Sequence, residues 1–161
     1  MTENIAIRLA RPGDEGEVLR LIKALAVYER CPDAVAATAE SLRATLFGPA
    51  PQVFAFLAGP EAAPVGLALW FQTYSTWTGR PSLYLEDLFV DDSARGQGVA
   101  RALLRRLAQE ALARDCARID WAVLDWNTEA MAFYRRIGAR AQSGWQPWRI
   151  EGAALSALAA G

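Results

Sequence analysis

The stretch from Leu83 to Leu112 constrains the fold of this chain more than any other part of the sequence. An apolar segment is followed by a turn that contains Gly96 and Gly98, and then by apolar residues at helical spacing, which predicts a strand, a tight turn and a helix. The first N–H groups of a helix have no partner within the helix, and the helix dipole is positive at that end. Because glycine carries no side chain, the backbone of such a turn can approach a ligand closely. The stretch therefore predicts a site for an anion such as phosphate.

The glycine spacing separates this turn from two common nucleotide-binding motifs. The dinucleotide fingerprint has a different glycine spacing and an acid about 20 residues later, and the P-loop ends in Gly-Lys-Ser or Gly-Lys-Thr. The sequence from Arg95 to Ala100, Arg-Gly-Gln-Gly-Val-Ala, fits neither pattern. Two interpretations remain, an anion site of another class and a tight turn that binds no ligand.

The composition is that of a compact globular protein. The chain has 161 residues, of which 53% are hydrophobic and 22% charged, so we predict a single domain over residues 1–161. The net charge is −1 and no basic stripe is present, so no nucleic-acid partner is expected. No apolar run approaches the roughly 20 residues of a membrane span, and the N-terminus does not resemble a secretion signal. We therefore expect a cytoplasmic protein without a membrane partner.

The absence of histidine narrows the chemistry that the chain can perform. Histidine is the commonest general base and the commonest zinc ligand, so a Ser-His or Cys-His nucleophile in its usual form is excluded. Cys31 and Cys116 are too few and too far apart for a disulfide framework or a metal motif. We therefore expect no metal, and acid–base chemistry that depends on carboxylates, tyrosine, lysine, arginine or water.

Hydrophobic periodicity and turn residues divide the chain into a series of strands and helices. In chain order we predict a strand at 5–9, helices at 15–29 and 38–47, strands at 53–58, 64–71 and 83–90, a helix at 99–114, a strand at 118–124, a helix at 128–137, short strands at 141–145 and 148–150, and an alanine-rich helix at 152–160. A polar, aromatic loop is expected at 74–81. The order β-α-α-β-β-β-α-β-α-β predicts an α/β or α+β fold, with a central sheet between helices.

Five motifs resemble one known family of enzymes. The run Arg95-x-x-Gly98-x-Ala100 matches the Arg/Gln-x-x-Gly-x-Gly/Ala signature of the GNAT superfamily of acyl-CoA N-acyltransferases. Four motifs are similar to the diamine (spermidine/spermine) N-acetyltransferase branch: Leu-Ala-Val-Tyr-Glu at 25–29, Tyr-Leu-Glu-Asp-Leu-Phe-Val at 84–90, Trp-Asn at 126–127 and Phe-Tyr-Arg-Arg-Ile-Gly-Ala at 133–139. The resemblance covers nearly the whole chain and implies a mixed, mostly antiparallel central sheet with helices on both faces.

The resemblance also implies acetyl-CoA as the co-substrate. In the family, the glycine turn and the helix that follows it hold the pyrophosphate, and backbone groups at the splayed end of the central strand bind the pantetheine amides and polarise the thioester carbonyl. The residues that match cofactor-binding positions are Leu88, Phe89, Val90, Arg95, Gly96, Gln97, Gly98, Val99, Ala100, Asn127 and Arg136. Asn127 also suits a helix N-cap, and Arg136 also suits a solvated surface.

Glu86 and Asp87 are adjacent acids within an apolar strand. Neighbouring residues of a regular strand point to opposite faces, so only one of the two is expected to share a face with a given substrate. Both also have a purely structural interpretation, since a carboxylate in an apolar strand needs a partner or solvent. By resemblance, Glu86 matches the glutamate that receives the amine proton, directly or through water. A primary ammonium has a pKa of about 10.4 and is unreactive until that proton is removed.

Tyr134 is the predicted acid of the same reaction. By resemblance its hydroxyl lies near the cofactor sulfur and protonates the departing thiolate. A phenol with a pKa of about 10 is close to a thiol at about 8.5, so the transfer needs no extreme donor. The plain alternative is a packed aromatic residue, because Met131, Phe133 and Ile137 beside it are apolar.

The amine site is predicted from Tyr28, Glu29 and Trp77, which match acceptor-site residues of the diamine enzymes. Ser75 and Gln146 depart from that pattern, because the diamine enzymes carry acids at both positions. A site that lacks two carboxylates should bind polyamines less well, so a smaller diamine or an amino acid stays open as the substrate.

The sequence as a whole predicts an acetyl-CoA-dependent N-acetyltransferase that acts on a primary amine of a small molecule, by direct transfer in a ternary complex. The resemblance further implies a homodimer. Two alternatives remain, a protein or peptide N-acetyltransferase on the same fold and a non-catalytic acyl-CoA-binding module.

Overall fold

The computed structural model describes residues 5–161, which form two compact units. The first unit ends at Ala122 and contains the sheet, and the second runs from Val123 to Gly161 and is helical. In the described part of the chain, no helix combines the length and the apolar character that crossing a membrane requires.

The first unit is built on a five-stranded sheet whose strands lie in chain order. Its strands are β1 (Ile7–Leu9), β2 (Val53–Ala58), β3 (Gly66–Ser75), β4 (Arg80–Val90) and β5 (Ile119–Asp120). The pairs from β1 to β4 are antiparallel, and only β4 and β5 run parallel. The structure confirms the mixed, mostly antiparallel sheet that was predicted.

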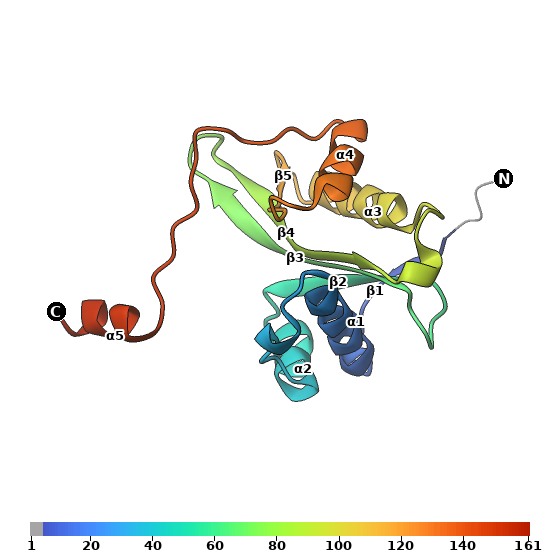
Figure 1. Cartoon of the computed structure of the whole chain (residues 1–161), viewed down its shortest axis with the longest axis horizontal. Helices are drawn as coiled ribbons and strands as arrows, with labels where there is room; N and C mark the ends of the chain where they lie inside the picture. Colours follow the sequence, from blue (N-terminus) through green and yellow to red (C-terminus); the bar gives the residue numbers. More distant parts are fainter. Residues whose placement is uncertain (1–4) are drawn as a thin grey trace. The chain divides into compact units, whose positions relative to one another are not determined.

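Helices cover both faces of this sheet, as Figure 1 shows, with α1 (Glu15–Tyr28) and α2 (Ala39–Phe47) on one face and α3 (Val99–Ala113) on the other. Side chains of β2 alternate between the two faces, as the period of two in a strand requires. Ala55 and Leu57 belong to the core with α1 and α2. On the opposite face, Arg106 of α3 lies over the ring of Phe56, with its guanidinium carbon 4.4 Å from the ring centroid.

The hairpin between β3 and β4 is longer than predicted. Half of the residues expected to form a loop at 74–81 belong instead to the two strands, because Tyr74 pairs with Pro81 and Ser75 pairs with Arg80, and residues 76–79 form the turn. Strand propensity depends on cross-strand neighbours, so the polar composition of this stretch was a weak indicator of where the strands end. The predicted strand at 118–124 is shorter than expected, since β5 ends at Asp120.

The second unit contains α4 (Thr128–Arg136) and α5 (Gly152–Ala160), which confirms both predicted helices. Asn127 is the N-cap of α4, and its side-chain oxygen accepts a hydrogen bond of 3.2 Å from the N–H of Ala130. The strands predicted at 141–145 and 148–150 are wrong, because this part of the described structure contains no strand. Pro147 interrupts the segment, and a proline cannot donate a ladder hydrogen bond.

Candidate active site

A β-bulge lies where the two adjacent acids occur. In the pairing of β3 with β4, Leu69 is opposite Asp87 and Trp70 is opposite Leu85, so Glu86 is an extra residue of β4. A bulge interrupts the ladder and the alternation of side chains. The expectation that Glu86 and Asp87 point to opposite faces depended on a regular strand, and this strand is not regular there.

Asp87 is the more buried of the two acids, and Glu86 is exposed. Burial, together with the negative charges of Glu86 and Glu29, raises the pKa of Asp87 to about 6. Burial also raises the pKa of Glu29, which follows the last residue of α1. The helix end and the bulge thus bring three carboxylates together, and we call Glu29, Glu86 and Asp87 the acidic cluster. Such a cluster favours a cation.

Asp87 is a candidate for proton transfer that the sequence did not single out. Its position in an apolar strand was visible, but the bulge and the nearness of Glu29 depend on tertiary structure. The raised pKa makes Asp87 a second candidate for proton transfer, beside the predicted base Glu86. Within residues 5–161, no group of three or more metal-binding side chains is arranged to hold a metal ion.

The glycine turn, residues 95–100, has the backbone geometry of an anion site. Gly96 has a φ of 73° and Gly98 a φ of 85°, both in the left-handed region that favours glycine. A Cβ placed on either residue would meet no heavy atom within 4 Å, so open space lies beside both. Gly98 is the N-cap of α3, and neither a side-chain cap nor an acid occupies the first turn of this helix. The positive end of the helix therefore faces this space without a competing acid in that turn.

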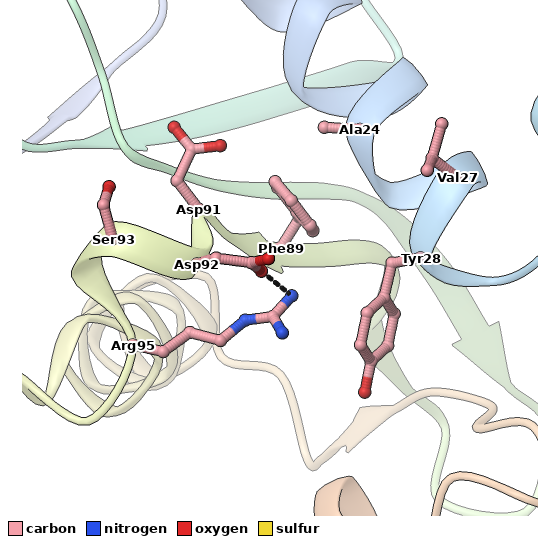
Figure 2. A pocket seen from close by; sticks show the side chains of 8 residues that line it. All are labelled: Ala24, Val27, Tyr28, Phe89, Asp91, Asp92, Ser93 and Arg95. Carbon is pink, nitrogen blue, oxygen red and sulfur yellow. Dashed lines mark ion pairs between the residues drawn. The ribbon is translucent and has the colours of Figure 1, made fainter.

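Arg95 extends from this turn toward α1, as Figure 2 shows. Its Nε donates a hydrogen bond of 3.2 Å to the carbonyl oxygen of Val90, and its guanidinium forms an ion pair of 2.9 Å with Asp92. The guanidinium carbon lies 4.7 Å from the ring centroid of Tyr28 and 5.9 Å from that of Phe89. The structure thus brings together Tyr28, predicted for the amine site, and two residues predicted for the cofactor.

A cavity of about 550 Å³ lies between the end of α1 and the end of β4. Its lining combines apolar side chains with two acids, one serine and one arginine: Ala24, Val27, Tyr28, Phe89, Asp91, Asp92, Ser93 and Arg95. Arg95 of the glycine turn and three residues of α1 therefore line one cavity of the first unit.

The end of β4 has an unpaired edge. On the β3 side, Leu88, Phe89 and Val90 pair with residues 66–68. On the β5 side, the described pairing is limited to two positions and ends at Tyr84 opposite Asp120. Beyond Tyr84 this edge has no strand partner among the described residues, although the carbonyl oxygen of Val90 already accepts a hydrogen bond from Arg95. Such an edge suits the predicted contacts to pantetheine amides.

The remaining predicted residues belong to the turn between β3 and β4 and to the second unit. Trp77 is in the turn between β3 and β4, with 86% of its surface exposed. Tyr134 and Arg136 are on α4 in the second unit, where the rings of Phe133 and Tyr134 have centroids 5.5 Å apart. The N-cap interpretation of Asn127 is confirmed, and the cofactor roles of these α4 residues stay predictions.

Comparison with known proteins shows the family. The model of the acetyltransferase (GNAT) family matches residues 19–139. The thialysine N-epsilon-acetyltransferase of Bos taurus is 40% identical over 166 aligned positions, which cover 96% of this chain and 97% of that protein. The spermidine/spermine N(1)-acetyltransferase-like protein 1 of Homo sapiens is 36% identical, over 89% of this chain and 22% of its own length. Among solved structures, an integron cassette protein of V. cholerae has a TM-score of 0.81 and 27% identity, over 99% of this chain and 98% of that one.

The mixed sheet and the glycine turn that opens α3 are features expected of an acyl-CoA-dependent transferase. The chain belongs to the acetyltransferase (GNAT) family. It is an N-acetyltransferase of the diamine branch that its motifs predicted. The family uses acetyl-CoA as its co-substrate, and the residues present fit that ligand. Open space beside Gly96 and Gly98 suits its phosphates, and the unpaired edge of β4 suits its amides.

Proposed function

We propose that this enzyme transfers the acetyl group of acetyl-CoA to a primary amine of a small diamine or an amino acid with a terminal amine. The acidic cluster carries this proposal, because three carboxylates at one place suit a substrate with positive charge. The names of two relatives support it, since one is named for thialysine and the other for spermidine and spermine.

Glu86 is the proposed base. Its exposed carboxylate accepts a proton from the ammonium, directly or through water, which frees the nitrogen lone pair for attack on the thioester carbon. The pKa of Asp87, about 6, still lies below neutral pH, so Asp87 is mostly ionised there and keeps a negative charge beside Glu86. Glu29 supplies a further negative charge for the distal cation of the substrate, with Trp77 as another acceptor-site residue.

Tyr134 is the proposed acid, and it donates its hydroxyl proton to the thiolate that departs when the C–S bond breaks. Acetyl-CoA supplies the activated thioester. The backbone N–H near Phe89 polarises the thioester carbonyl, and the glycine turn holds the pyrophosphate with Arg95. Asn127 and Arg136 of the second unit contact the cofactor in this proposal. A single domain over residues 1–161 stays a prediction.

A homodimer in the cytoplasm is the proposed state of the enzyme. Large exposed side chains of the second unit, Trp145, Trp148, Leu155 and Leu158, support a contact with a second copy. Sedimentation equilibrium should then give twice the mass of the chain, and a monomer at micromolar concentration would contradict the dimer.

A thiol-release screen tests the function. Acetyl-CoA is offered with short diamines, polyamines, thialysine and other lysine analogues, amino acids, aminoglycosides and lysine-containing peptides. We expect the highest kcat/KM with short diamines or lysine analogues, because Ser75 and Gln146 replace acids that would bind longer polycations. A preference for peptides would favour the protein N-acetyltransferase alternative, and CoA binding without thiol release for any amine would favour a non-catalytic module.

A further inference from the structure

Arg95 is the signature residue of the glycine turn, but its side chain does not stay within the turn. It spans from β4 to α1, with its Nε on the carbonyl oxygen of Val90 and its guanidinium carbon 4.7 Å from the ring centroid of Tyr28. An aromatic ring attracts a guanidinium through its face, and this attraction leaves the N–H groups at the guanidinium edge available. Tyr28 can therefore hold the guanidinium in place while its edge binds an anion.

The edge of the same guanidinium has a carboxylate partner. Asp92 forms the 2.9 Å ion pair with Arg95, and 86% of the Asp92 side chain is exposed. An exposed pair of this kind contributes little to stability, so a phosphate can displace the carboxylate at small cost. Phosphate and carboxylate use the same forked geometry on a guanidinium and therefore compete for it.

We propose that Tyr28 is a positioning residue for Arg95, and that Asp92 is an internal competitor that occupies the guanidinium until the pyrophosphate of acyl-CoA replaces it. This inference rests on the proposed function, since it takes acyl-CoA as the ligand of the glycine turn. It changes the assignment of Tyr28, which sequence resemblance placed at the amine site. Helix α1 then contributes to acyl-CoA recognition through Arg95, although it does not belong to the turn.

The two partners of Arg95 should have opposite effects on CoA affinity, as measured by calorimetry on the full chain. Tyr28→Leu removes the ring and should weaken CoA binding roughly two- to fivefold, the value of a partly exposed cation–π contact. Tyr28→Phe keeps the ring and should bind CoA as the wild type does. Asp92→Asn removes the competitor and should tighten CoA binding about twofold.

Asp91→Asn is the matched control for charge. Asp91 is adjacent in the chain and lines the same cavity, but its carboxylate is 3.4 Å from Arg20 and not paired with Arg95. Both aspartate variants lose one negative charge near the turn. A gain in CoA affinity that appears only in Asp92→Asn therefore comes from the release of Arg95 and not from the change in charge. Pantetheine is the second probe, because it lacks the pyrophosphate, and its affinity should not respond to either aspartate variant.

A double-mutant cycle tests whether Tyr28 acts through Arg95. In an Arg95→Gln background, Tyr28→Leu should cause no further loss of CoA affinity. The steady-state readout is a raised KM for acetyl-CoA with an unchanged KM for the amine. A raised KM for the amine alone would return Tyr28 to the amine site and overturn the inference.

The outcomes separate the inference from the function on which it rests. If the wild-type chain does not bind CoA, the proposed function and this inference fail together. If it binds CoA but neither Tyr28→Leu nor Asp92→Asn changes the affinity, only this inference fails. Tyr28 also packs against the core, so Tyr28→Leu could fail to fold. In that case the comparison of Asp92→Asn with Asp91→Asn still tests whether Asp92 competes with the pyrophosphate for Arg95.

Discussion

The glycine turn and the acidic cluster are both candidate binding sites of the first unit, but they are built in different ways. The turn presents its backbone, and what it needs from the sequence is glycine at two positions with positive φ. The acidic cluster presents side chains, and it needs a bulge in β4 and the end of α1 at the same place. A backbone site is therefore encoded locally, whereas a side-chain site depends on tertiary structure.

The largest effect should come from a side chain that transfers a proton. Tyr134→Phe keeps the ring and removes the acid, so kcat should fall roughly 100-fold or more while the KM for the amine changes little. Thiol release under saturating acetyl-CoA measures this. Turnover like that of the wild type would show that the thiolate leaves without help from Tyr134.

Glu86→Gln should have the next largest effect, and it tests which carboxylate of the acidic cluster is the base. Loss of the base should lower kcat/KM for the amine by roughly 100-fold and remove the rise of kcat/KM with pH. Asp87→Asn is the matched variant, since it removes an adjacent carboxylate of the same strand. If Glu86→Gln keeps the wild-type pH profile and Asp87→Asn loses it, then Asp87 is the base.

Asp87 should also cause a pH-dependent loss of stability. Its pKa is about 6 in the folded chain, against about 3.9 for an unfolded aspartate, so between these values the folded state binds more protons. Stability should therefore fall as pH rises from about 4 to 6, by roughly 2 to 3 kcal/mol, and stay low above that range. Urea unfolding at pH 7.5 should show Asp87→Asn to be more stable than the wild type, with the difference absent near pH 3.5. Equal stability at pH 7.5 would mean that the charge is not destabilising.

The smallest effect should come from the backbone site. Gly98→Ala places a Cβ where φ is 85°, which costs about 1 kcal/mol of stability and should raise the KM for acetyl-CoA roughly fivefold. Gly16→Ala is the control, because Gly16 lies in α1 outside the left-handed region and an added Cβ meets no atom within 4 Å. This control should be more stable by up to about 1 kcal/mol, with its KM unchanged. If both variants behaved alike, the conformation of Gly98 would not matter for binding.

Much of the fold was predictable because its signals are local. The periodicity of α1 and α3, the strand at 53–58 and the cap at Asn127 are all encoded within short windows of sequence. The ends of β3 and β4 were not, because the pairing of Tyr74 with Pro81 is decided between strands. The strands expected in 141–150 were wrong for a similar reason, since strands require partners as well as apolar residues.

The same distinction applies to the site. The glycine turn was found from its spacing, and its positive φ values agree with that prediction. Asp87 was placed second to Glu86, because resemblance pointed to Glu86 and alternation in a regular strand left only one of the two acids for the substrate. No local signal marks the bulge. The contact between Arg95 and Tyr28 joins residues that are far apart in the chain, and no pattern in the sequence indicates it.

The bulge also bears on how this enzyme can vary among its relatives. Because Glu86 is an extra residue of β4, Leu85 pairs with Trp70 and Asp87 pairs with the adjacent residue Leu69. The pairing of β3 with β4 therefore continues in regular register on both sides of the bulge. The carboxylate proposed as the base is in effect a one-residue insertion between two strand segments. Evolution can therefore exchange the side chain at this position, or adjust its neighbours to another amine, while the buried residues on each side keep their partners.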